Sequence, residues 1–174
     1  KIIVPFLSLL LLLSLVGCGS EEQESKSTSS ETEREVTPTT IIDQTGNEVT
    51  IPEDIDRIVV VSAAECEIVY ALDAGDLVVG RGEYCNYPPE AEEVKVVQSG
   101  SDLNQEQIVA LDPDIVFMNS MSQTEEQIQG LKDADIEVFV AQSTDIEGTY
   151  ESISLIGQIL GKQDKADSII ESMK

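Results

Sequence analysis

The chain has 174 residues, a formal net charge of −24, and neither His nor Trp. The strong negative charge argues against nucleic acid as a partner, because phosphate binding requires clustered Lys and Arg. The lack of His removes the commonest general base and the commonest transition-metal ligand, which argues against hydrolases, metalloenzymes and haem ligation.

The first segment, residues 2–16, is almost purely apolar, with Lys1 in front and small residues behind. It is shorter than the roughly 20 apolar residues of a membrane-spanning helix, and its layout is typical of a secretory signal. Its exit, Leu15-Val16-Gly17-Cys18, resembles the lipobox of bacterial lipoproteins. This resemblance implies that residues 1–18 are a lipoprotein signal peptide. Cys18 would then carry the lipid that anchors the protein to the extracytoplasmic face of the bacterial cell membrane. An ordinary signal peptide with an incidental Cys is the alternative.

Residues 19–40 change to a composition rich in Ser, Thr and Glu without apolar periodicity. Such a segment cannot bury enough apolar surface to offset the entropy of ordering it, so we expect a disordered tether. The chain starts at Lys1 rather than Met and stops inside a helical pattern at Lys174. We therefore expect it to be a fragment of a longer protein.

Beyond the tether, strand and helix patterns alternate along the chain. A β-hairpin is predicted from residues 40–43 and 48–52. The continuous apolar runs at 57–61, 77–80, 115–118 and 136–140 predict strands covered on both faces. Helical spacing predicts helices at 65–73, 105–111, 125–133 and 146–160, and a further helix from residue 164. Stop signals follow three of them: Gly75 after the first, Asp112-Pro113 after the second and Gly161 after the fourth. Asn104 with Gln107, and Thr144 with Glu147, fit helix capping boxes.

Alternating strands and helices predict an α/β fold in which a parallel sheet carries helices on both faces, preceded by the small β-hairpin. Ligands of such folds bind outside the carboxyl ends of the strands. The loops expected there are 62–66, 81–89, 119–122 and 142–145.

Four segments stand in an order that resembles a known family. They are Ile58-Val59-Val60-Val61-Ser62, Val79 to Ala91 with its Tyr-Cys-Asn-Tyr-Pro-Pro run, Asn104-Gln105-Glu106-Gln107-Ile108, and Leu111-Asp112-Pro113-Asp114-Ile115-Val116. They resemble the substrate-binding proteins of ABC importers for cobalamin and ferric siderophores. The resemblance implies two Rossmann-like α/β lobes joined by a long helix, with residues 41–162 as the N-terminal lobe, residues 163–174 as the start of the connecting helix, and the second lobe absent.

The same resemblance implies a monomeric binding protein that captures a corrinoid or a ferric siderophore and delivers it to a permease and its ATPase. It implies no enzymatic activity and no cofactor beyond the metal chelate carried as ligand. A lipid-anchored sensor or adhesin on the same scaffold is one alternative. A hydrolase or oxidoreductase is another, but the sequence has neither a Gly-x-Ser-x-Gly nor a Gly-x-Gly-x-x-Gly motif.

Candidate ligand contacts follow the first two strands of the predicted sheet. Tyr84, Cys85, Asn86 and Tyr87 form the loop after the second strand, and the two tyrosines offer flat apolar faces with hydroxyl groups to a bulky chelate. The alternative is that both rings only pack the loop against the sheet. Glu65 and Cys66 follow the first strand and are expected to face the same crevice. Glu65 is equally compatible with a solvated carboxylate at a helix start.

Glu106 matches the family glutamate that docks onto arginines of the permease, although a first-turn Glu is also favoured by the helix dipole alone. Cys66 and Cys85 lie at the same predicted sheet edge. They could form a disulfide, remain free thiols, or touch a ligand or metal. Two thiols without His do not make a zinc site, so no metal site is predicted.

Overall fold

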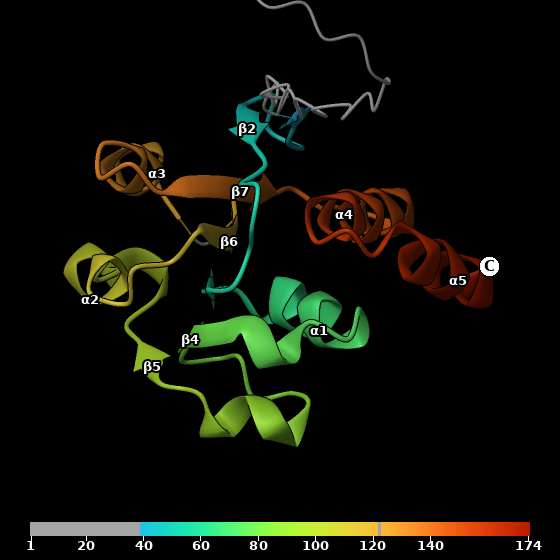
Figure 1. Cartoon of the computed structure of the whole chain (residues 1–174), viewed down its shortest axis with the longest axis horizontal. Coiled ribbons are helices and arrows are strands. Elements are labelled where there is room, and N and C mark those ends of the chain that lie inside the picture. Colours follow the sequence, from blue (N-terminus) through green and yellow to red (C-terminus); the bar gives the residue numbers. More distant parts are fainter. Residues whose placement is uncertain (1–38, 122) are drawn as a thin grey trace, which may run out of the picture. The chain divides into compact units, whose positions relative to one another are not determined.

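The computed structural model describes residues 39–121 and 123–174, in which a parallel sheet is flanked by helices (Figure 1). The strands are β1 (Thr40–Ile42), β2 (Glu48–Thr50), β3 (Ile58–Val60), β4 (Val78–Gly82), β5 (Val96–Val97), β6 (Ile115–Asn119) and β7 (Glu137–Ala141). The α-helices are α1 (Ala63–Ala71), α2 (Gln105–Val109), α3 (Glu125–Lys132), α4 (Ile146–Ile159) and α5 (Gln163–Met173), and three 3-10 turns are η1 (Gly75–Leu77), η2 (Pro89–Glu93) and η3 (Gly100–Asp102). The predicted signal peptide, Cys18 and the tether up to residue 38 lie outside the described residues.

The main sheet has five parallel strands in the order β5-β4-β3-β6-β7. The chain begins in the middle with β3, builds outward to β5, and then returns to the other side of β3 to add β6 and β7. The direction of winding therefore reverses between β3 and β6, which is the switch point where open α/β sheets form a crevice. The predicted fold class is confirmed.

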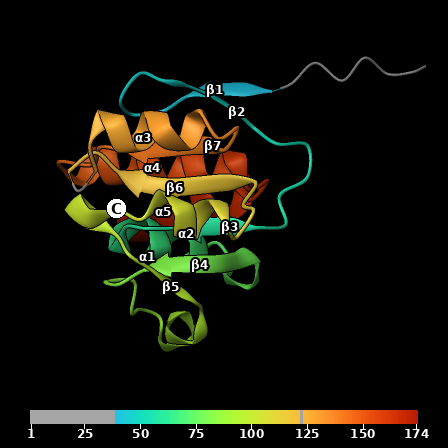
Figure 2. The ribbon, with the colours of Figure 1, turned by 90° about the vertical axis from the view of Figure 1, so that its left-hand side faces the viewer.

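Each face of the sheet buries its own apolar cluster, because successive side chains of a strand point to opposite faces. In β3, Ile58 and Val60 face one cluster while Val59 faces the other. The first cluster is covered by α1 and α4, and the second by α2 and α3, which lie in front of the sheet in Figure 2. Phe117 and Phe139 meet edge to face within the first cluster, with ring centroids 5.7 Å apart.

The end of the first helix differs from the prediction because an Asp, and not a Gly, adopts the left-handed conformation there. The predicted helix 65–73 begins two residues earlier as α1, and it is followed by Asp73 in the left-handed conformation, with φ of 56°. Gly75, predicted as its stop, instead begins η1. Asp can adopt this conformation because its short polar side chain tolerates it. Gly161 does follow α4 with φ of 64°, as predicted.

The helix caps correct two predictions. Asp145, not Thr144, is the N-cap of α4, and its Oδ1 accepts a hydrogen bond from the Gly148 amide at 2.8 Å. Asn104 does cap α2 through the Gln107 amide at 3.0 Å, but the Gln107 side chain accepts from the Gln98 amide instead of closing a box.

The hairpin of β1 and β2 docks onto the end of β7 and the start of α4. Gln44, in its turn, accepts hydrogen bonds from the Gln142 amide at 2.9 Å and the Ser152 hydroxyl at 2.6 Å, and donates to the Gly148 carbonyl at 2.9 Å. Asp43 is buried and accepts from the Val140 amide at 3.3 Å. These contacts join the hairpin to the sheet although it shares no strand pairing with it.

The last helix, α5, packs against α4, where Ala166 is fully buried. Lys165 forms an ion pair with Asp73 at 2.6 Å, and it is the one ion pair found among the described residues. Within residues 39–121 and 123–174, none of the helices combines the length and apolar character needed to cross a membrane.

Candidate ligand-binding site

A hollow of about 410 Å³ lies at the carboxyl edge of the sheet and spans the switch point. All five strands contribute to it through the residues at or just after their ends. Its lining consists of Val61, Ser62, Ala63, Ala64 and Glu65 after β3, Tyr84 after β4, Ser99 and Gly100 after β5, Asn119 and Met121 at β6, and Ser143 with Thr149 after β7. Its position agrees with the predicted ligand loops.

Tyr84 is the aromatic residue of this hollow and is held in a tight loop. The Cys85 amide donates to the Gly82 carbonyl and the Asn86 amide donates to the Tyr84 carbonyl, both at 3.1 Å. Gly82 is needed for this arrangement, because a Cβ at that position would lie 2.4 Å from the Val61 carbonyl oxygen. Tyr84 itself is 75 % exposed. The loop therefore presents a ring that the rest of the described fold leaves mostly exposed.

Glu65 lies in the first turn of α1 but is almost completely buried, with 1 % of its surface exposed. Its Oε1 accepts a hydrogen bond from the Asn119 Nδ2 at 3.3 Å, while its Oε2 has no partner. Burial raises the pKa of Glu65, although the hydrogen bond from Asn119 favours the ionised form. Glu65 is therefore a buried polar group at the base of the hollow, with one carboxyl oxygen unpartnered.

Cys66 and Cys85 are both free and fully covered, with 0 % and 1 % of their surfaces exposed. The neighbouring Cys85 thiol lowers the pKa of the Cys66 thiol, and the charge of Arg81 acts in the same direction. The neighbouring Cys66 thiol, together with burial, raises the pKa of Cys85. The Cys85 thiol also lies 3.5 Å from the Val60 carbonyl oxygen, to which it donates.

The predicted contacts thus divide into two groups. Tyr84 and Glu65 line the hollow, whereas Cys66 and Cys85 lie beneath its surface. Asn86 and Tyr87 are exposed on the same loop but are not part of the lining. The alternative interpretation of Glu65, as a solvated helix-start carboxylate, is wrong because the side chain is buried against Asn119.

Sequence reasoning did not single out Asn119, Ser99 or Ser143, which complete the lining. Asn119 accepts the Met121 amide at 2.9 Å on its Oδ1 while it donates to Glu65. Ser99 accepts the Glu83 amide at 3.3 Å and so supports the Tyr84 loop. The strand-end rule had placed Asn119 and Ser143 within two of the predicted ligand loops, but nothing in the sequence distinguished them from the other residues of those loops.

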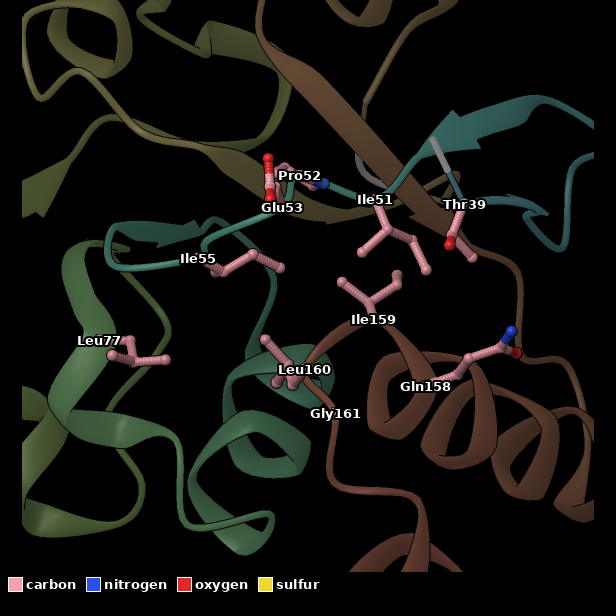
Figure 3. A pocket seen from close by; sticks show the side chains of 10 residues that line it. All are labelled: Thr39, Ile51, Pro52, Glu53, Ile55, Leu77, Gln158, Ile159, Leu160 and Gly161. Atoms are coloured by element: carbon pink, nitrogen blue, oxygen red, sulfur yellow. The ribbon is translucent and has the colours of Figure 1, made fainter. Parts of the chain in front are cut away.

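A second hollow, of about 610 Å³, lies at the opposite edge of the sheet (Figure 3). Ile51 and Ile159 point toward each other across it, and Leu160 directly follows α4 beside Ile159. Because it borders the starts of β3 and β4, it is not at the edge where ligands of parallel sheets bind.

Comparison with known proteins gives the family. Residues 58–174 match the model of the periplasmic binding protein family. The chain belongs to this family. It is 37 % identical over 169 residues to YvrC of Bacillus subtilis, an uncharacterized ABC transporter substrate-binding lipoprotein. The matched region covers 95 % of this chain and 53 % of YvrC. It is 30 % identical to the cobalamin-binding protein of Halobacterium salinarum, over 79 % of this chain and 38 % of that protein.

Among solved structures, the periplasmic solute binding protein of Veillonella parvula superposes with a TM-score of 0.70 and 25 % identity, covering 79 % of this chain and 45 % of that one. The family resemblance read from the sequence is confirmed. The chain spans about half, or less, of the length of the relatives it matches.

Proposed function

We propose that this chain is the ligand-binding part of an extracytoplasmic substrate-binding protein that serves an ABC importer. The observation that supports this most directly is the hollow at the switch point, built from the ends of all five parallel strands in a chain of the periplasmic binding protein family. Its polar groups are arranged to hold a ligand, and the function needs no covalent chemistry. The protein is accordingly proposed not to be an enzyme.

The proposed ligand is a bulky metal chelate, a corrinoid or a ferric siderophore. The exposed ring of Tyr84 offers a flat surface on which a macrocycle or a chelate can stack. The cobalamin-binding relative supports the corrinoid over the siderophore. The metal would arrive inside the ligand, as part of the chelate. No resident cofactor is proposed.

Calorimetric titration of the purified protein with cyanocobalamin and, separately, with a ferric hydroxamate tests this function. Saturable binding at micromolar or tighter affinity, about −8 kcal/mol, is the expected result with one of the two. Absence of heat with both, from a protein shown to be folded by circular dichroism, would contradict the proposed ligand class and favour the sensor or adhesin function.

The Tyr84→Ala variant tests the hollow. Loss of a stacked ring is expected to weaken binding of the ligand by about tenfold or more, in line with aromatic contacts at binding surfaces. Met173→Ala, which removes another exposed apolar side chain at the end of α5, is the matched control and should leave the affinity unchanged. Equal affinities for wild type and Tyr84→Ala would place the ligand elsewhere, and a Tyr87→Ala variant then tests the outer ring of the loop.

The attachment and partners of the protein are also proposals. Glu106 is exposed in the first turn of α2, where a carboxylate can pair with arginines of a permease. The lipoprotein relative supports a lipid anchor at Cys18 and a place on the extracytoplasmic face of the membrane. A monomer suffices for this role, with the permease and its ATPase as partners.

A further inference from the structure

A third hollow, of about 670 Å³, lies between the turn of the β-hairpin and α3. Ser120 after β6 and Gln142 after β7 line it, so it also lies at the carboxyl edge of the sheet, where ligands of parallel sheets bind. Asn119, Met121 and Ser143, their neighbours in the chain, line the first hollow instead. Adjacent residues of the same two strand ends therefore serve different hollows.

This polar hollow offers hydrogen bonds and little net charge. Its uncharged polar residues are Thr45, Asn47, Ser120, Gln123, Gln129 and Gln142. Glu125 and Lys132, which also line it, carry opposite charges, although the whole chain has a formal net charge of −24. Ile128 adds a half-buried apolar side chain to the wall formed by α3. The lining therefore suits a neutral ligand that forms several hydrogen bonds.

Gln123 is the residue that points to a ligand. It is 8 % exposed, and its Oε1 accepts a hydrogen bond from the Asn119 backbone amide at 3.0 Å. This bond fixes the orientation of the carboxamide, because in the flipped arrangement Nε2 would face another donor. Nε2 has no hydrogen-bond partner among the described residues. Buried polar groups in proteins are nearly always hydrogen-bonded, so this donor is left for a group that enters the hollow.

We propose that the polar hollow binds a small, neutral, polyhydroxylated molecule of the chemical class of sugars. Each hydroxyl group of a sugar donates and accepts, and each carboxamide carries a donor and an acceptor side by side. Gln123 would donate to a ligand hydroxyl through Nε2, with Ser120 and Gln142 bonding its neighbours, while Ile128 contacts the C–H face of the ring. The volume lies within the range of about 300 to 1,000 Å³ that is typical of small-molecule sites. This inference goes beyond the proposed transport function and does not depend on it.

Titration of the ¹⁵N-labelled protein with glucose, ribose and N-acetylglucosamine, followed by NMR, tests the site. The side-chain amide of Gln123 gives its own signal, which should shift saturably with at least one of the three, at a millimolar dissociation constant or tighter. No shift of this signal with any of them would overturn the proposal. A shift with the zwitterion glycylglycine and none with the sugars would overturn it as well, because Glu125 and Lys132 would then be binding opposite charges.

The Gln123→Glu variant removes the Nε2 donor and keeps an oxygen that accepts from Asn119. It should weaken binding of the sugar by about tenfold or more, measured on the side-chain amide signals of Asn47 and Gln142. Gln158→Glu adds the same charge at the opposite edge of the sheet and should leave the affinity unchanged. An affinity of Gln123→Glu equal to that of the wild type would contradict the proposal.

If the spectrum of Gln123→Glu is not that of a folded protein, Ser120→Ala makes the same comparison by removing a hydroxyl group from the lining. It should weaken binding of the sugar several-fold, and an unchanged affinity would contradict the proposal. None of these titrations contains a metal chelate, so their failure is distinct from failure of the proposed function.

Discussion

At the scale of single residues, Glu65 combines deep burial with a hydrogen-bond partner for only one of its carboxyl oxygens. An unsatisfied buried carboxylate is costly, and the raised pKa of Glu65 reflects this cost. Because the folded-state pKa lies above the unfolded-state value, the folded protein binds the proton more tightly. The free energy of unfolding is therefore highest below the unfolded-state pKa and falls as the pH rises through the folded-state pKa, so the burial of Glu65 opposes folding at pH values above the unfolded-state pKa.

Glu65→Gln should remove this opposition. The amide oxygen can still accept from Asn119, but no charge is buried. The variant is expected to be more stable than the wild type at neutral pH, with the difference vanishing below about pH 4. Urea unfolding at several pH values measures it, and Glu67→Gln, an exposed neighbour on the same helix, is the control. Lower stability of Glu65→Gln at neutral pH would mean that the hydrogen bonds of the carboxylate outweigh its burial.

At the scale of elements, two adjacent polar residues at the start of α4, Thr144 and Asp145, are expected to contribute differently to stability. Asp145→Ala should lower the free energy of unfolding by about 1 kcal/mol, because the Gly148 amide loses its acceptor and the helix dipole loses a favourable charge. Thr144→Ala should change stability by less than about 0.5 kcal/mol, as for an ordinary exposed site. Chemical denaturation of both variants gives the comparison. A larger loss of stability for Thr144→Ala than for Asp145→Ala would support the capping box of Thr144 and Glu147 predicted from the sequence.

The sequence predicted the elements with strong apolar patterns and missed those without one. β3, β6 and β7 were recognised because each is a continuous apolar run. β5 was missed because Val96 and Val97 are too few to form a pattern, and pairing with Arg81 and Gly82 of β4 makes them a strand. Pairing partners distant in the chain are not visible in local sequence.

The same distinction applies to the hollow. The strand-end rule placed the correct loops together, and Tyr84 and Glu65 were selected from them. Which side chains of a loop turn inward depends on packing beneath it. Cys66 is adjacent to Glu65 in sequence, yet it packs below the surface, and Asn86 on the Tyr84 loop is turned to solvent. Chain proximity therefore did not separate lining from support.

At the scale of the whole molecule, charge is poorly balanced. The chain carries 34 Asp and Glu against 10 Lys and Arg, while the described residues hold the single ion pair between Lys165 and Asp73. Repulsion among like charges opposes the compact state, and exposed pairs contribute little. Screening by salt should therefore favour folding.

The urea midpoint is expected to rise as KCl increases from about 0.01 M to about 1 M, because the Debye length falls from about 30 Å to about 3 Å. KCl is used rather than a sulfate salt, since sulfate also strengthens apolar burial. The Asp73→Asn variant serves as a control that removes the ion pair, and its midpoint should follow the same salt dependence. A midpoint that falls with KCl would mean that attraction between unlike charges dominates.

Gln44 gives the hairpin a mechanical role. The described chain enters the fold at Thr39, whose carbonyl accepts from the Ile51 amide, and the hairpin is joined to the residues around Ser143 and Thr149 through Gln44. Those two residues form one wall of the hollow. Tension applied to the chain at Thr39 would therefore be borne first by the hairpin and then by that wall. A force on the N-terminal side of the fold and the binding of a ligand in the hollow would therefore act on the same hydrogen bonds, those of Gln44 with Gln142 and Gly148.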